Sequence, residues 1–423
     1  MPSETPAIQI PQREVVREVM ANGTVFLYAP NPYNPIVAMN ILSRQASRHE
    51  QAEKAGMANL CMRLLSAGTD LHTEEEIAIN LERNGALFKA EAGKDNSAVD
   101  LLSTTHFFQD DLQAVLELLD RPTFPEDKIE RECEIVRMNI LEQEDSLLTY
   151  TMRIFRKLFF GDHPYSWPNI GLVETLDNIE RDDLVPFAQG VFEPSNLIVS
   201  VVGGSEKSGV REMISNAFAD RPVNGYRSIP DPPPAAPAFV SNCEKVEQKE
   251  SEAEYIVMGY PGCSIRDEIA IPMRLIGAIL GGSMDSRLFR EIRDKRGLCY
   301  QVGANFTPSH GHSPLMIYAV SSPQNRRDVI SCAEAEIKRL QDESISEEEL
   351  DRVKTYICGT NVMSMETVMG QASRFALYEA AGLGWEYANR FSEEIYKADA
   401  QTIQDVARKL LTHRLLTITA PPA

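Results

Sequence analysis

The sequence predicts an α+β fold of two similar α/β-sandwich domains, in each of which a mixed β-sheet is flanked by helices. Three observations predict it. Strand-like, β-branched runs precede apolar helical patterns, this order occurs twice, and a proline-rich segment lies near the midpoint of the 423 residues. Strands that alternate with long helices are typical of layered architectures. Because the halves match in pattern rather than in residue identity, we interpret them as domains related by duplication.

A proline-rich segment divides the chain. Residues 221–237 read RPVNGYRSIPDPPPAAP, and proline at this density neither continues a helix nor fits a central strand. It does stiffen a spacer between domains. We therefore expect a first domain over residues 1–222, a linker over 223–239 and a second domain over 240–423.

Each half follows the same order of elements. The sequence of the first half predicts strands at 25–28, 36–42 and 196–204, and helices at 56–65, 112–119, 129–141 and 182–187. The second half predicts strands at 254–260 and 415–420, and helices at 271–280, 329–340 and 402–411. Ser346 and Glu349 form a capping box, which predicts one more helix over 350–357 because the two side chains satisfy free backbone donors of a first turn.

The composition excludes several classes of partner. A formal charge of -20 at pH 7 argues against nucleic acid or an anionic membrane surface, since both require basic patches. The acidity either only aids solubility or attracts basic peptides. The sequence contains no run of about 18 apolar residues, so we expect no membrane span. The N-terminus lacks the features of a targeting signal.

The cysteines indicate the compartment. Seven of them are scattered along the chain without a C-x-x-C pair. An odd, dispersed set of this kind indicates reduced thiols rather than a disulfide framework. We therefore expect a cytoplasmic protein, in which a residue such as Cys61 is a small apolar core residue.

The most specific signal is the segment GMANLCMRLLSAGT at residues 56–69. With its surroundings, 46–69, and with two further blocks at 161–184 and 286–304, it resembles the pitrilysin/insulinase family of zinc peptidases, which includes the processing peptidases. The blocks occur in the order and spacing of that family, and the resemblance extends over most of both halves. It implies, in active members, a zinc site built on an inverted His-x-x-Glu-His motif.

The motif positions of this chain hold none of those residues. The resemblance places the two histidines at Asn59 and Arg63, the catalytic glutamate at Met62, and a third ligand at Met138, which Asn139 follows. Peptidase zinc is bound by imidazole and carboxylate groups, and the glutamate activates a water. The guanidinium of Arg63 would in addition repel the cation. We therefore expect that the zinc motif is degenerate at these positions. We expect this chain to bind no zinc and no other cofactor, and to contain no catalytic residue.

The other histidines give no alternative metal site. His310 and His312 form a His-x-His pair, but no third ligand follows nearby. We expect them in a solvent-exposed loop. His163, in the segment DHPY, is expected to be a packing or turn residue.

In the second half, Arg293 and Tyr300 occupy positions of a residue pair that the family carries. The resemblance implies that Arg293 and Tyr300 contact the substrate backbone near the scissile carbonyl. The chemistry suits these side chains, because a tyrosine hydroxyl can donate to an oxyanion and an arginine can hold a peptide carbonyl. The alternative is that Arg293 lies on a solvated helix face and Tyr300 packs in a sheet. Arg287, Arg290 and Arg296 are expected to be surface or ion-pair residues.

Taken with the resemblance, these positions imply a non-catalytic, substrate-binding subunit of a heterodimeric zinc metalloendopeptidase of the processing-peptidase type. Its expected partners are a zinc-bearing homologous subunit and a peptide or unfolded segment as substrate. The short segment LGGSMD at 280–285 lacks the expanded glycine-rich loop of mitochondrial inactive subunits, which favours a bacterial-type pair. A structural or assembly subunit, or a peptide-binding module without a proteolytic role, stays open.

Overall fold

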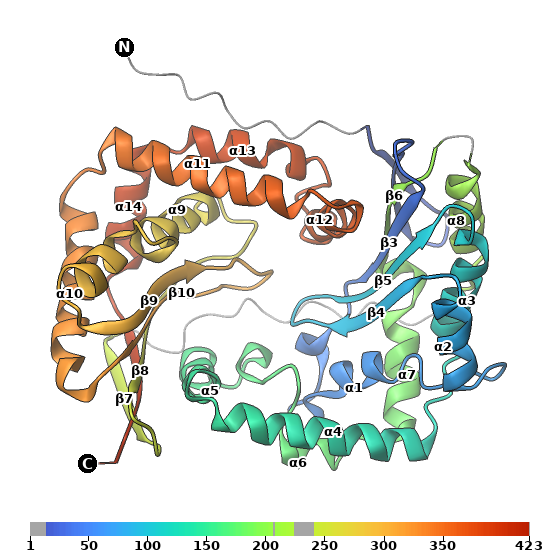
Figure 1. Ribbon diagram of the computed structural model, residues 1–423, viewed down its shortest axis with the longest axis horizontal. Helices are drawn as coiled ribbons and strands as arrows, with labels where there is room; N and C mark the ends of the chain where they lie inside the picture. Colours follow the sequence, from blue (N-terminus) through green and yellow to red (C-terminus); the bar gives the residue numbers. More distant parts are fainter. Residues whose placement is uncertain (1–13, 206–207, 224–240, 423) are drawn as a thin grey trace.

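The computed structural model describes residues 14–205, 208–223 and 241–422 and contains two mixed β-sheets surrounded by helices, one sheet from each half of the chain (Figure 1). The predicted α+β class with two domains is confirmed. The expected linker at 223–239 lies outside the described residues from position 224 onward. The boundaries 1–222 and 240–423 therefore stay predictions.

The first half forms a six-stranded sheet in the order β1-β2-β6-β3-β5-β4, in which β2 and β6 are parallel. Its strands are β1 (Val16–Val19), β2 (Val25–Ala29), β3 (Ile36–Ser43), β4 (Leu87–Ala92), β5 (Ser97–Thr104) and β6 (Leu197–Gly203). Its α-helices are α1 (Met57–Arg63), α2 (Glu74–Glu82), α3 (Phe108–Asp120), α4 (Glu126–Asp145), α5 (Leu147–Phe160), α6 (Val173–Leu176), α7 (Arg181–Val191) and α8 (Val210–Ala219). Short 3-10 turns are η1 (Ser47–His49), η2 (Ala52–Lys54), η3 (Pro164–Ser166) and η4 (Pro194–Asn196).

The second half forms a five-stranded sheet in the order β7-β11-β8-β10-β9, in which β7 and β11 are parallel. Its strands are β7 (Cys243–Gln248), β8 (Glu254–Tyr260), β9 (Cys299–Phe306), β10 (Leu315–Ser321) and β11 (Leu415–Ala420). Its helices are α9 (Ala270–Gly281), the π-helical turn η6 (Phe289–Asp294), the 3-10 turn η7 (Pro323–Asn325), α10 (Arg326–Asp342), α11 (Glu347–Ser364), α12 (Val368–Ala380), α13 (Tyr387–Lys397) and α14 (Ala400–Leu410).

The central strands are buried on both faces. In β2, Phe26 and Tyr28 belong to one hydrophobic core, and the alternate residues Val25 and Leu27 belong to another. A strand with two dry faces appears in the sequence as a continuous apolar run. This is why the predicted strands at 254–260 and 415–420 coincide with β8 and β11. Of the predicted capping box of α11, the Ser346 half is present, since the Ser346 side chain accepts from the Glu349 amide.

Each sheet is covered on one face by a helix from the other half of the chain. Helix α12 packs on β3 and β6 of the first sheet, where Ala372 and Ala376 are fully buried. Helix α5 packs on β8 and β11 of the second sheet through the buried rings of Phe155 and Phe159. In Figure 1, α5 and α12 lie between the two sheets on opposite sides of the molecule. The two halves therefore share their cores.

Glycine at position 259 permits the contact of α5 with the second sheet. A Cβ on Gly259 of β8 would lie 2.3 Å from two carbons of the Phe155 ring. No side chain fits at that distance, so the ring lies directly on the strand backbone. The absence of a side chain thus determines how closely α5 approaches.

A polar contact also joins the halves. The Tyr165 hydroxyl donates to Asp95 Oδ1 at 2.5 Å and accepts from the Gly311 amide at 2.7 Å. The backbone N–H of His310 donates to Asp95 Oδ2 at 3.0 Å. Burial, followed by the Asp95 charge, raises the pKa of Tyr165, so the hydroxyl stays protonated and can donate. We call Asp95, Tyr165 and residues 310–311 the inter-half contact.

None of the helices formed by the described residues is both long enough and apolar enough to cross a membrane.

Candidate functional site

The helix that carries the motif positions begins at a closely packed turn. Gly56 precedes α1 with φ of 100°, and a Cβ there would lie 2.8 Å from the Gly171 Cα atom. The buried Glu50 carboxylate accepts from the amides of Gly56 at 3.1 Å and Ala58 at 2.6 Å, and so caps α1. Burial raises the pKa of Glu50 to about 7, although both hydrogen bonds oppose this. Lys94, whose charge also favours the carboxylate, faces Glu50.

The three motif positions on α1 have different surroundings. Met62 is 2% exposed and belongs to the hydrophobic core of the first half. Asn59 is half-buried, and its Nδ2 atom has no hydrogen-bond partner among the described residues. Arg63, one turn after Asn59, donates from Nε and Nη2 to Glu132 Oε1 on α4. The position of the catalytic base thus holds a core residue, and the second ligand position holds half of an ion pair.

Glu132 on α4 pairs with Arg63 on α1 and so identifies the face of α4 that lies against the motif positions. Residues seven apart lie on the same face of a helix, so Asn139 shares the face of Glu132. Met138 is 60% exposed and lies about a third of a turn away from that face. The geometry therefore favours Asn139 over Met138 as the position opposite α1.

The residues present do not suit a zinc ion. Asn59, Arg63 and either Met138 or Asn139 offer no imidazole and no carboxylate, which are the ligands that zinc requires here. The Glu132 carboxylate is occupied by the Arg63 guanidinium, and the Glu50 carboxylate by the amides at the start of α1. Within residues 14–205, 208–223 and 241–422, no three histidine, cysteine, aspartate or glutamate side chains cluster as a metal site would need. No chemistry through a metal can be assigned to these residues.

Arg293 lies on η6 in the second half and its side chain is exposed. Its guanidinium carbon lies 4.7 Å from the centroid of the Phe289 ring, in a cation–π contact. In the described part of the chain no carboxylate forms an ion pair with Arg293. The guanidinium is thus held over an aromatic ring while its donors stay available.

Tyr300 lies at the start of β9, the edge strand of the second sheet. Val320 pairs with Gln301 and Ser321 pairs with Cys299, so Tyr300 is the extra residue of a β-bulge. A bulge redirects the side chain that it carries. Tyr300 is 70% exposed, so its ring does not pack in the sheet core.

The structure brings some of the predicted residues together and leaves others apart. Asn59, Met62 and Arg63 share α1, and an ion pair links this helix to α4. No hydrogen bond or ion pair between described residues connects Arg293 or Tyr300 to that group. Glu132 was not anticipated from the sequence. Its position seven residues before Asn139, on one helical face, was the available signal.

The expectations for the remaining histidines and cysteines have mixed outcomes. Cys61 is fully buried in the core, and His163 accepts from the Tyr165 amide at the start of η3, as a turn residue does. The expected exposed loop with His310 and His312 is wrong for His310, because this residue packs into the inter-half contact and both its ring nitrogens are shielded from solvent. Asp95 and Tyr165 of the first half bury His310, and the sequence around His310 gives no sign of these distant partners. All seven cysteines are free thiols.

Arg287 donates to both carboxylate oxygens of Glu349, and Arg290 lies 3.5 Å from Asp285. The expected ion-pair roles of these two arginines are confirmed.

Two family models match the chain. The model of the insulinase family (peptidase family M16) matches residues 25–160, and the model of the peptidase M16 inactive domain matches residues 178–357. Together the two matches span most of both halves. The chain belongs to the M16 peptidase family. The resemblance to the pitrilysin/insulinase peptidases is thereby confirmed.

Individual relatives agree with this assignment. A protein of Bacillus subtilis described as the uncharacterized zinc protease YmxG is 23% identical over 399 residues, which are 94% of this chain and 96% of that protein. The crystal structure of a peptidase M16 inactive domain from Pseudomonas fluorescens matches with a TM-score of 0.87 at 20% identity, covering 97% of this chain and 99% of that one. A chain of complex III2 from Candida albicans matches with a TM-score of 0.81 at 14% identity, covering 96% of both chains. At such identities the two structures show a shared fold.

Proposed function

We propose that this M16 chain is a non-catalytic subunit that holds peptide substrate for a zinc-bearing homologous partner, and that the pair is a metalloendopeptidase of the processing-peptidase type. One contrast carries the proposal. Two side chains at the motif positions have partners within the chain. Met62 lies in the hydrophobic core, and Arg63 forms an ion pair with Glu132. Arg293 and Tyr300 are exposed and unpaired among the described residues. The zinc and the catalytic base are expected in the partner.

The chain's own residues can hold an extended peptide. Strands β4 and β9 are edge strands, whose outer backbone groups are not paired within their sheets. An extended peptide can add to such an edge as one more strand, with main-chain hydrogen bonds along its length. Strand β4 packs against α1, and β9 begins at Tyr300. Each half thus offers an edge close to its own set of site positions.

Arg293 and Tyr300 have complementary roles in this scheme. The Tyr300 hydroxyl is a donor that can stabilise charge on a carbonyl oxygen as it becomes an oxyanion. The Arg293 guanidinium has five N–H donors and can hold neighbouring peptide carbonyls. The cation–π contact with Phe289 restricts the guanidinium before substrate binds. These groups orient and stabilise, and they carry out no proton transfer or nucleophilic attack.

The test is to purify this chain alone, a family member with an intact His-x-x-Glu-His motif from the same genome, and the two together. We expect no stoichiometric zinc and no peptidase activity in this chain, and more activity in the mixture than in the partner alone. Zinc content would be measured by mass spectrometry and cleavage with an unfolded peptide. Stoichiometric zinc or cleavage by this chain alone would contradict the proposal.

A purely structural role is the second candidate. The fold match to a chain of complex III2 supports it, because that chain is part of a complex. The two roles differ in the mixture experiment. A structural subunit would assemble with its partner without raising the turnover of that partner.

The cytoplasm remains the proposed compartment. It is supported by the seven free cysteines, six of which are buried.

A further inference from the structure

The four edge strands of the two sheets differ in charge. Three of them contain charged residues, namely Arg17 and Glu18 on β1, Lys89 and Glu91 on β4, and Glu244, Lys245 and Glu247 on β7. Strand β9, with the sequence CYQVGANF, contains none. Charged side chains on an edge strand keep it from pairing with another chain. Strand β9 therefore lacks the protection that the other three edges have.

The outer backbone groups of β9 are not used within the described structure. The strand lies at the end of the order β7-β11-β8-β10-β9 and pairs with β10. Outside that pairing, no backbone hydrogen bond between described residues involves positions 299–306. After the bulge at Tyr300, the pairing with β10 is regular from Gln301 to Phe306. This stretch can therefore pair with an added extended segment along its outer edge.

One face of β9 is closed to a ligand. Val302, Ala304 and Phe306 belong to the core of the second half. Helix α9 lies directly on the strand backbone there, since a Cβ on Gly281 would be 1.9 Å from the Ala304 amide nitrogen. The side chains of β9 that an added segment can contact therefore lie on the opposite face.

That opposite face is polar and open. Gln301, Gly303 and Asn305 alternate along it, and the amide side chains of Gln301 and Asn305 are exposed. Neither amide side chain forms a hydrogen bond with a described residue. Two residues of a strand span about 7 Å. The two amides are therefore spaced like side chains four residues apart on one face of an extended peptide, with Gly303 between them.

Gly303 allows a hydroxyl to lie between the two amides. Tyr318 of β10 pairs with Gly303, and a Cβ on Gly303 would be 2.5 Å from the Tyr318 hydroxyl oxygen. The phenol therefore lies across the edge strand, as aromatic side chains do over a glycine of a neighbouring strand. The parallel ring of Tyr255 on β8 lies beside it, at a centroid distance of 6.4 Å. The Tyr318 hydroxyl forms no hydrogen bond with a described residue.

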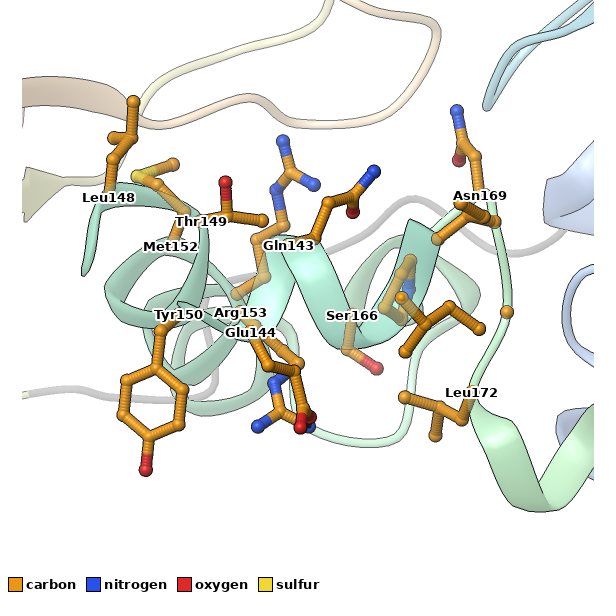
Figure 2. Close-up of a pocket in the computed structure, with 15 residues that line it drawn as sticks. Gln143, Glu144, Leu148, Thr149, Tyr150, Met152, Arg153, Ser166, Asn169 and Leu172 are labelled. Carbon is orange, nitrogen blue, oxygen red and sulfur yellow. Dashed lines mark ion pairs between the residues drawn. The ribbon is translucent and has the colours of Figure 1, made fainter. Parts of the chain in front are cut away.

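Helix α5 covers this face of the second sheet only in part. It packs on β8 and β11. Its free side is not filled, because Leu148 and Met152 line a pocket of about 400 Å³ between α4, α5 and residues 166–172. Figure 2 shows both side chains pointing from α5 toward the ribbon of the second half. The exposed amides of Gln301 and Asn305 are thus not covered by the helix.

We propose that the outer edge of β9 binds an extended peptide segment with uncharged hydrogen-bonding side chains, such as serine, threonine, asparagine or glutamine, at every second residue. Directly opposite residues of paired strands have Cβ atoms about 5 Å apart. Three successive side chains on one face of the segment then meet the Gln301 amide, the Tyr318 hydroxyl and the Asn305 amide. Each of these groups both donates and accepts hydrogen bonds.

The absence of charge favours this class of segment. Neither β9 nor β10 contains a charged residue, so a charged side chain opposite them would lose water without gaining a counter-ion. The edge begins at Tyr300, which the proposed function assigns to substrate binding. The segment is thus the substrate of the proposed function, on which its role in proteolysis rests.

The experiment measures binding to the purified full chain without any partner. Three fluorescent peptides of equal length differ in three positions. The first has glutamine at alternate residues, the second has the same composition with the glutamines three residues apart, and the third has glutamate at the alternate residues. In the second peptide, successive glutamines point to opposite faces of a strand. Fluorescence anisotropy should show the first peptide binding at least about tenfold more tightly than the second, because two side-chain hydrogen bonds are lost.

The glutamate peptide should bind more weakly than the first. If it binds as tightly, the edge does not select uncharged side chains and the proposal is wrong. Equal binding of the first two peptides would also overturn it, since the spacing of the three groups on β9 would then not be recognised.

Substitutions on this face test which groups are responsible. Tyr318→Phe should weaken binding of the alternating peptide several-fold without lowering the melting temperature, because its hydroxyl has no partner in the described structure. Tyr255→Phe is the matched control, since it removes the same group from the stacked ring on β8, away from the edge. Its binding should not change. Unchanged binding in Tyr318→Phe, or equal losses in both variants, would contradict the role of Tyr318 and the proposal with it.

The double variant Gln301→Ala, Asn305→Ala should remove the preference for alternating glutamines. Turnover of the pair is measured separately. A pair that cleaves peptide, with no preference for alternating glutamines in this chain, would overturn the β9 site alone. A preference in this chain, with no added turnover in the pair, would support the β9 site and overturn the role in proteolysis. Dimers of this chain that the double variant abolishes in size-exclusion chromatography would assign the edge to a second copy and overturn the proposal.

Discussion

Arg63 in the first half and Arg293 in the second are both arginines at positions where the family resemblance implies a site, but their surroundings differ. Arg63 donates twice to Glu132, a carboxylate that is 8% exposed. Arg293 lies over the Phe289 ring and forms no ion pair with any described carboxylate. The first guanidinium is used to join two helices of its own half. The second stays exposed to solvent over an aromatic ring.

The same difference extends to the neighbouring residues. Around α1, Met62 is part of the core and Glu50 caps the helix, so this region contributes to stability. Around β9, a bulge turns Tyr300 outward. The comparison teaches that Met62 and Arg63, at positions implied for a metal site, have partners inside the chain. The side chains of Arg293 and Tyr300, in contrast, are exposed and form no ion pair or hydrogen bond with the described residues.

The largest effect is expected where the halves depend on each other. Phe155→Ala removes a fully buried ring from the contact of α5 with the second sheet and should cost about 3–5 kcal/mol in the free energy of unfolding. Because α5 belongs to the first half in sequence, both halves should lose stability together. Chemical denaturation with separate probes in the two sheets measures this. A second sheet that keeps its stability would show that the halves are independent.

The next effect concerns turnover of the assembled pair. Tyr300→Phe should lower kcat/KM about 100-fold, the usual loss when one donor to an oxyanion is removed. Arg293→Ala should lower it as well, because donors to the peptide carbonyls are lost. Arg290→Ala is the matched control, since Arg290 is on the same turn and lies near Asp285; its activity should stay close to that of the parent. If all three variants keep full turnover, the structural role is favoured over substrate binding.

A smaller effect is expected in the first half, on stability alone. Arg63→Met leaves the Glu132 carboxylate without its partner and should cost about 1–2 kcal/mol, below the value for a fully buried pair because the Arg63 side chain is 37% exposed to water. The double variant Arg63→Met, Glu132→Leu should recover most of that loss. Thermal and denaturant unfolding of the two variants measures the difference, and turnover of the pair should not change.

A double variant less stable than Arg63→Met would contradict this account, since the carboxylate would then not be the source of the cost.

The sequence predicted well those features that depend on local pattern. The strands at 254–260 and 415–420 were found because a strand buried on both faces is apolar at every residue. The cap at Ser346 was found because it involves residues three apart. The motif positions were located through the family resemblance, which depends on local blocks.

The features that the sequence did not predict depend on partners distant in the chain. An amphipathic helix such as α5 must pack on something, but its pattern does not say that the surface belongs to the other half. Glu132 is one of many acidic residues on α4, and only the fold brings it to Arg63. His310 was expected in an exposed loop because nothing nearby indicates Asp95 and Tyr165. The choice between Met138 and Asn139 required knowing which face of α4 meets α1.

The smallest expected effect is a dependence on pH at the start of α1. The pKa of Glu50 is raised from 4.5 to about 7 by burial, so the folded state holds a proton that the unfolded state has released between these values. Stability from this group is therefore present below about pH 4.5 and is lost as the pH rises through about 7. Glu50→Gln keeps one acceptor for the α1 amides but cannot titrate. Its unfolding free energy should change less over this range than that of the parent.

Glu53→Gln is the control for this last comparison, because Glu53 is exposed on η2, three residues away in sequence. It should follow the parent curve, since a substitution at this exposed side chain leaves the surroundings of Glu50 unchanged. Lys94 faces Glu50 and titrates above this window, where burial sets its pKa at about 8, so its contribution appears at higher pH and can be separated. A parent protein whose stability rises between pH 4.5 and 7, with a flat Glu50→Gln curve, would mean that Lys94 keeps Glu50 ionised in the folded state. The cap on α1 would then be an ion pair, the second charged pair of this region beside Arg63 and Glu132.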